Sequence, residues 1–167
     1  KSDVADFTNG LTINSVASDK ISRSYSQDRI KRGNVSVEAK TMTVDFSKGD
    51  SAAMSMEWVV KNNDIAFRYL IPRQKKEETG CMVITEEATG FHFPSFTTTF
   101  ITPQSDPMIG WKRSKPSYEE EYTNDSPMST PSKYGRGYTF PALFHVGDNG
   151  WALVSETGVS GNYCASR

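Results

Sequence analysis

One carboxylate, Glu156, stands where its charge would need a partner. A strand that continues from Trp151 to residue 156 would project Glu156 from the same face as Ala152 and Val154. A carboxylate at the end of a strand that is apolar on both faces is partly desolvated, and burying it unpaired is costly. An arginine side chain, several backbone N–H groups, or a hard metal ion such as calcium would each satisfy it.

An acidic run at residues 119–121 is flanked by Tyr118 and Tyr122. Its carboxylates can hold a cation or supply an acid and base pair, and the flanking rings would suit a loop that faces a sugar. A solvated charged face is the more common arrangement for three adjacent carboxylates, so both interpretations stay open.

The histidines offer no obvious catalytic or metal-binding set. His92 and His145 are the only two, and neither has a second ligand three or four residues away. His145 alternates with Phe144 and Val146, as a residue on one face of a strand does. We therefore expect a structural role for both.

Composition bounds the class of protein. The chain has 167 residues, of which 36% are hydrophobic, a size that fits one domain with its own core. Nineteen basic and 20 acidic residues give a net charge of -1, so no global field attracts nucleic acid or an anionic membrane. The longest apolar stretches are short and are interrupted by Arg68, which argues against a membrane-spanning helix.

Period-two hydrophobicity dominates the local pattern, which predicts an all-β fold. A first β-hairpin is expected from 52–60 through a turn at 61–64 to 65–71, and a second from 138–146 through 147–150 to 151–154. The last of these strands is apolar on both faces, so it should lie in the middle of a sandwich. Further strands are expected at 11–17, 20–30, 81–86, 90–94 and 96–102.

Two irregularities interrupt this pattern. The apolar positions switch from odd to even between Val35 and Phe46, which predicts a β-bulge or a bend near Lys40. Residues 103–137 are rich in proline, serine, threonine and charge, and are expected to form a long excursion from the sheet. Cys81 and Cys164 lie far apart without a CxxC motif, so a disulfide and two free thiols both stay open.

Several long stretches resemble the N-terminal domain of glycoside hydrolase family 97, the SusB-like α-glucosidases and α-galactosidases. The similar stretches occur in the same order as in the family, and the resemblance covers residues 6–167. They are Asp64-Ile-Ala-Phe-Arg-Tyr69, Ile84-Thr-Glu-Glu87, Lys115-Pro-Ser-Tyr-Glu-Glu-Glu-Tyr122, the run from Tyr138 to Val159, and Asn162-Tyr-Cys-Ala-Ser-Arg167.

The resemblance implies a β-sandwich, a supersandwich like that of galactose mutarotase, incomplete at its N-terminal edge. Residues 1–167 would form one domain that packs on a catalytic (β/α)8 barrel of the same polypeptide, and the catalytic carboxylates would belong to that barrel. Calcium at the active site would take Glu156 as a ligand from this domain. Trp111, Tyr118, Glu119 and Tyr122 would help to wall the sugar pocket.

Two further expectations follow from the resemblance. The substrate would be an oligosaccharide or other α-glycoside, with no nucleic acid or membrane partner, and the protein would be periplasmic or extracellular. The alternative function is a free-standing carbohydrate-binding β-sandwich that uses exposed aromatic residues such as Trp111 and Tyr118.

Overall fold

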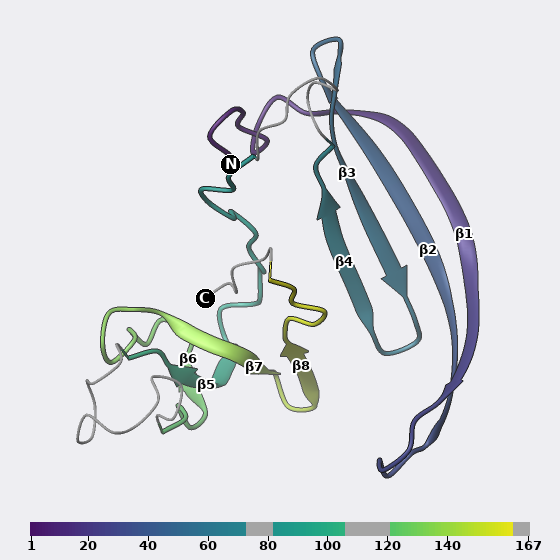
Figure 1. Cartoon of the computed structure of the whole chain (residues 1–167). Helices are drawn as coiled ribbons and strands as arrows, with labels where there is room; N and C mark the ends of the chain where they lie inside the picture. The colour runs from purple at the N-terminus through teal and green to yellow at the C-terminus, as the bar shows by residue number, and fades with distance from the viewer. Residues whose placement is uncertain (73–81, 106–120, 162–167) are drawn as a thin grey trace. The chain divides into compact units, whose positions relative to one another are not determined.

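The regular structure is entirely β in the part of the chain that the computed structural model describes, residues 1–72, 82–105 and 121–161 (Figure 1). The all-β class predicted from the sequence is confirmed. No helix in these ranges is long and apolar enough to cross a membrane. The eight strands there are β1 (Thr12–Ser26), β2 (Asn34–Lys48), β3 (Ser51–Val60), β4 (Ile65–Leu70), β5 (Thr98–Pro103), β6 (Ser126–Pro127), β7 (Tyr138–Val146) and β8 (Gly150–Val154).

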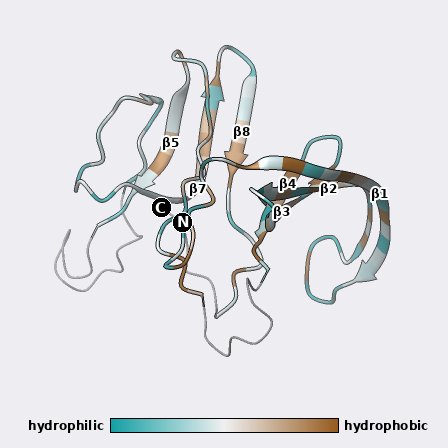
Figure 2. Cartoon of the chain, turned by 90° about the horizontal axis from the view of Figure 1, so that it is seen from above, coloured by the Kyte–Doolittle hydropathy of each residue, from teal (hydrophilic) through white to brown (hydrophobic). Residues whose placement is uncertain are grey.

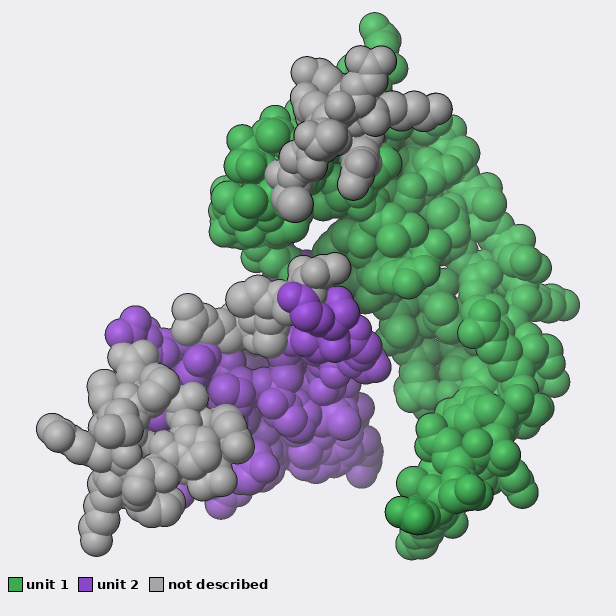
Figure 3. Space-filling view, in the orientation of Figure 1, with its two compact units in different colours: residues 1–88 green, residues 89–167 purple. Residues whose placement is uncertain are grey.

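The strands form two antiparallel sheets, as an all-β sandwich domain requires. Each sheet belongs to one of two compact units, residues 1–88 and residues 89–167 (Figure 3). The first sheet has the order β1-β2-β3-β4 and the second has the order β6-β5-β7-β8. Hydrophobic residues mark strands of both sheets (Figure 2).

The first predicted hairpin is confirmed as β3 and β4. The Lys61 amide donates to the Asp64 carbonyl at 2.8 Å, and the Lys61 ammonium lies 2.9 Å from the Asp64 carboxylate. Directly paired residues share one face, which gathers aromatic rings: the Trp58 and Phe67 centroids are 5.1 Å apart. The core of this unit packs Phe7, Ala53 and Met54 against Ala5, Leu11, Phe46, Ile71 and Met82.

The bulge expected near Lys40 is wrong. Lys40 pairs directly with Lys20 on β1 and with Val60 on β3, and the register shifts lie elsewhere, at Ile13/Ser15 and Phe46/Ser47. Val60 is the last residue of β3, so the apolar phase of β2 changes where the third strand ends. Beyond that point β2 pairs only with β1 among the described strands. The partly buried positions stay odd from Val35 to Thr43, so the shielded face does not change at Lys40.

Some of the strands predicted from less regular patterns are present, and others are not. Residues 11–17 and 20–30 fall largely on one long strand, β1, and residues 96–102 correspond to β5. The strand expected at 90–94 is wrong, because this segment has no ladder partner. Of the strand expected at 81–86, residues 82–86 hold only a bridge between Ser2 and Ile84.

The second predicted hairpin is confirmed as β7 and β8, but its central position is wrong. β8 lies at the edge of its sheet, where Trp151 and Leu153 are 55% and 68% exposed. The turn is one residue shorter than the expected 147–150: Gly147 adopts a positive φ of 63°, and Gly150 already pairs with Val146. A strand with two apolar faces can occupy the edge of this sheet because the His145 ring of β7 stacks on the Trp151 ring of β8, as described below.

Candidate functional site

Glu156 lies two residues beyond the end of β8, because the strand stops at Val154 and does not continue to residue 156. The alternation of burial nevertheless persists to this residue. Ala152, Val154 and Glu156 are each partly buried, while the residues between them are exposed. The carboxylate is thus held at the end of the edge strand in the partly desolvated position that the sequence predicts.

Tyr122 belongs to the opposite edge of the same sheet. The amide of the next residue, Thr123, donates to the Ile101 carbonyl at 2.8 Å, on the side of β5 that faces β6. Two strands, β5 and β7, intervene before β8, and three strand spacings amount to about 14 Å. The structure therefore does not bring Tyr122 together with Glu156, although the ring itself is 68% exposed and open to a partner.

The remaining candidates fall outside the described residues. These candidates are Trp111, Tyr118 and Glu119. The two cysteines, Cys81 and Cys164, also fall outside the described residues. Their expected roles in a pocket wall and in a disulfide stay predictions.

The described part of this chain can supply only part of a calcium site. Carboxylate oxygen is a ligand type that calcium prefers, and Glu156 supplies it at a partly shielded strand end, but calcium takes six to eight oxygens. Among the described residues, no group of three or more His, Cys, Asp or Glu side chains gathers that could hold a metal ion. Most ligands would have to come from outside the described part of the chain.

A polar cluster that the sequence did not reveal lies on the same sheet. Thr98, His145 and Trp151 are direct cross-strand neighbours on β5, β7 and β8. The Thr98 hydroxyl donates to the carboxylate of Asp125, and His145 Nδ1 lies 3.4 Å from the same oxygen. The rings of His145 and Trp151 stack with centroids 4.1 Å apart and an angle of 10° between their planes.

The loop before β6 places Asp125 in this cluster. Asp125 adopts a left-handed conformation with φ of 50°, which aspartate tolerates better than most residues. No local pattern signals this role, because Thr98 and His145 are 27 and 20 residues away along the chain. The arrangement confirms that His145 lies on a strand face, and it ties three strands of the sheet to one loop.

Acid should loosen this cluster. The hydrogen bond from Thr98, reinforced by His145, holds the pKa of the Asp125 carboxyl below its ordinary value. A carboxyl with a lowered folded-state pKa stabilises the fold above its unfolded pKa, and the contribution is lost as the pH falls through the folded value. We expect the unfolding midpoint to fall as the pH drops below about 4, and to fall less in Asp125→Asn.

Urea unfolding at a series of pH values measures this effect. Asp148→Asn is the matched control, since it removes an exposed carboxylate from the β7–β8 turn that has no hydrogen-bond partner among the described residues. Equal acid sensitivity of wild type and Asp125→Asn would show that the Thr98–Asp125 bond contributes nothing to the pH dependence.

The fold and the site define a class: an all-β domain of two antiparallel sheets with a partly buried carboxylate, Glu156, just beyond the end of an edge strand. The family model described as "Glycosyl-hydrolase 97 N-terminal" matches residues 1–167. The chain therefore belongs to the family of N-terminal domains of glycoside hydrolase family 97, as the sequence resemblance indicated.

Two solved structures are similar to the chain. A beta-arabinopyranosidase is 49% identical over 99% of this chain, with a TM-score of 0.90, and the match spans 26% of that protein's chain. A glycoside hydrolase family 97 enzyme (E480Q) from Pseudoalteromonas sp. strain K8, in complex with panose, is 20% identical over 84% of this chain, with a TM-score of 0.64, and the match spans 20% of its chain. The second similarity shows the fold alone. No curated protein matches the chain.

Proposed function

We propose that this chain is an accessory domain of an exo-acting α-glycosidase. It packs on a catalytic (β/α)8 barrel of the same polypeptide, contributes Glu156 to a calcium site, and forms part of the wall of the sugar pocket. Membership of the family supports the accessory role, and the matched region spans only about a quarter of the similar arabinopyranosidase.

The observation that carries the calcium role is the position of Glu156. It stands just past the end of an edge strand, where no further strand of the described sheet covers it, and it is partly buried. A carboxylate there can reach a partner domain without any rearrangement of the sheet. Calcium bound at such a junction would neutralise the carboxylate and polarise substrate oxygens, while the barrel supplies the remaining ligands.

The substrate class follows from the chemistry of the neighbours. One similar structure, 49% identical over 99% of this chain, is a beta-arabinopyranosidase, so a pyranoside is the proposed substrate. The exposed ring of Tyr122, together with Trp111, Tyr118 and Glu119, would line an outer part of the pocket rather than the calcium site, given the separation of Tyr122 from Glu156. A periplasmic or extracellular location is proposed for the whole protein.

Metal removal tests this function. The full polypeptide, treated with a calcium chelator and then freed of it, should lose most of its turnover of an aryl pyranoside and recover it when calcium is added back. Magnesium should restore little, because it demands compact octahedral geometry and gives up its water reluctantly. Turnover that survives complete removal of calcium would rule out the metal role, whereas binding of glycans by the isolated chain would favour a free-standing module.

A further inference from the structure

A two-stranded ribbon at residues 20–40, which we call the arm, extends beyond the four-stranded sheet of the first unit (Figure 1). It consists of the ends of β1 and β2 and the loop that joins them. Lys40, at the base of the arm, still pairs with Val60 on β3, and the rest of β2 in the arm pairs only with β1 among the described strands. Six basic and two acidic residues give the arm a net charge of +4, whereas the whole chain has a net charge of -1. Positive charge is therefore concentrated on one projecting element.

None of these six cations forms an ion pair within the described chain. Lys20 and Lys40 even lie directly opposite one another, an arrangement that destabilises a ribbon unless an anion lies nearby. The six are Lys20, Arg23, Arg29, Lys31, Arg32 and Lys40. The arm thus has unsatisfied capacity for negative charge.

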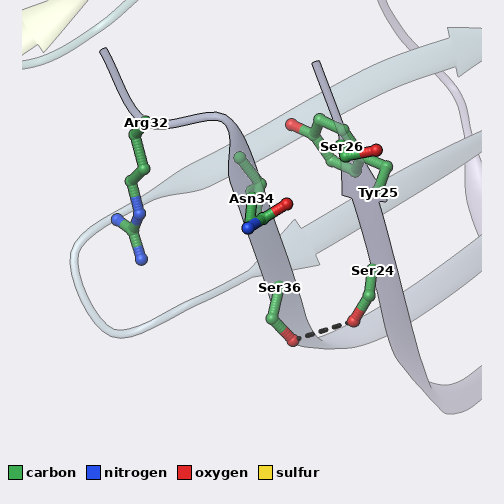
Figure 4. Close-up of a pocket in the computed structure, with 7 residues that line it drawn as sticks. Ser24, Tyr25, Ser26, Arg32, Asn34 and Ser36 are labelled. Atoms are coloured by element: carbon green, nitrogen blue, oxygen red, sulfur yellow. Dashed lines mark hydrogen bonds between the residues drawn. The ribbon is translucent and has the colours of Figure 1, made fainter. Parts of the chain in front are cut away.

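The two faces of the arm differ. The cross-strand pair Tyr25 and Val35 marks a face with apolar side chains, and the opposite face is wholly polar. On the polar face the Ser24 hydroxyl donates to the Ser36 hydroxyl at 3.2 Å (Figure 4). The residues of that face are Lys20, Ser22, Ser24, Ser26, Asn34, Ser36, Glu38 and Lys40. Glu38 lies next to the lysine pair, and only small hydroxyl and amide groups lie between Glu38 and the loop.

A hollow of about 530 Å³ lies at the loop end of the arm, lined by Ser24, Ser26, Arg32, Asn34 and Ser36 together with the neighbouring Tyr25 and Val35 (Figure 4). The Arg32 guanidinium makes no hydrogen bond or ion pair with another described residue. The hollow is open to solvent, and its other side-chain polar groups are hydroxyls and an amide.

We propose that the polar face of the arm binds an oligosaccharide that contains uronic acid residues. Serine hydroxyls and the Asn34 amide both donate and accept hydrogen bonds, as the hydroxyls of a sugar ring require. Arg32 only donates, in a planar fork that matches a carboxylate, and the lysine pair offers charge to a second carboxylate further along the ligand. The site is separate from the proposed function because it makes no use of Glu156.

The lining favours a sugar over two other anions. A free phosphate would be satisfied by the guanidinium and one or two donors and would leave the remaining hydroxyls unused. An acidic peptide would be expected to use apolar contacts beside its carboxylates, but only two of the seven lining residues, Tyr25 and Val35, offer apolar surface. Both alternatives are outcomes of the test below.

Calorimetric titration of the full polypeptide with tetragalacturonate tests the proposal. We expect saturable binding that weakens with added salt, and at least about tenfold weaker binding of the fully methyl-esterified oligomer, which has the same rings without charge. Arg32→Gln should weaken binding about tenfold. Arg29→Gln is the matched control, since it removes an equally unpaired cation from the same loop but does not line the hollow, and it should change affinity less than about threefold.

Asn34→Ala separates recognition of the ring from attraction of charge. It should weaken binding several-fold without changing the salt dependence, whereas Arg32→Gln should reduce that dependence. Equal losses in Arg29→Gln and Arg32→Gln, equal binding of polyglutamate, displacement by an equal concentration of inorganic phosphate, or absence of binding would each overturn the proposal. Far-ultraviolet circular dichroism confirms that each surface variant keeps its β structure.

Discussion

Glu156→Gln in the full polypeptide is expected to weaken calcium binding by at least about tenfold, which corresponds to about 1.4 kcal/mol. Glutamine keeps the length and shape of the side chain and still offers one carbonyl oxygen. It loses the negative charge and the bidentate coordination that calcium draws from carboxylates. Turnover at limiting calcium should fall in parallel and should recover in part at saturating calcium.

Asp148→Asn provides the control for this substitution. It also exchanges a carboxylate for an amide in the second unit, but on the exposed β7–β8 turn at the far end of β8 from Glu156. Calcium affinity measured by calorimetry should be unchanged in this variant. If Glu156→Gln binds calcium as tightly as wild type does, the carboxylate serves instead as a structural partner within the domain.

Gly150→Ala should destabilise the β7–β8 hairpin by about 1–3 kcal/mol. A Cβ at this position would lie 2.5 Å from the Val146 carbonyl oxygen and 3.2 Å from the Val146 Cβ. Because the closest of these atoms belongs to the backbone of the paired strand, no side-chain rotation can relieve the clash. The hairpin must open locally, which would also displace the Trp151 ring from its stack on His145.

Hydrogen exchange of the β7 and β8 amides measures this loss locally, even when other domains dominate the global unfolding of the polypeptide. Gly90→Ala is the control, because a Cβ there meets no atom within 4 Å and its φ is not positive. It should leave protection of the hairpin within about twofold of wild type, since removing glycine flexibility changes stability by less than about 1 kcal/mol. Unchanged protection in Gly150→Ala would show that the turn adapts without cost.

The acid sensitivity of Asp125 has a parallel on the first sheet. Hydroxyls of Ser15 and Ser55 donate to the Asp45 carboxylate at 2.5 and 2.6 Å, which lowers the pKa of that carboxyl. Asp45 links β2 to both of its neighbouring strands, and Asp125 links the loop before β6 to β5. The contribution of these bonds decreases as the pH falls through the folded pKa of each carboxyl. Sequence alone gives no sign of either pairing, because strand register sets which side chains meet.

Local patterns were sufficient to predict both hairpins. Apolar and polar residues alternate around Trp58 and around Phe144, and turn residues follow each segment. These patterns reflect preferences of the local chain that do not depend on distant contacts. The same reasoning placed β8 in the middle of a sandwich and a bulge or bend near Lys40; the central position and the bulge were wrong. Neighbouring strands decide what covers a face, and the alternation in one segment does not contain that information.

The amino-acid sequence alone thus determined the all-β class, the two hairpins, the family resemblance and the candidacy of Glu156, since each depends on residue order within a short stretch. Only the tertiary structure decided that β8 is an edge strand, that Asp125 joins Thr98 and His145, and that the basic residues of the arm lie beside a polar hollow. These features depend on contacts between residues distant along the chain, which form only when strand pairing fixes their register.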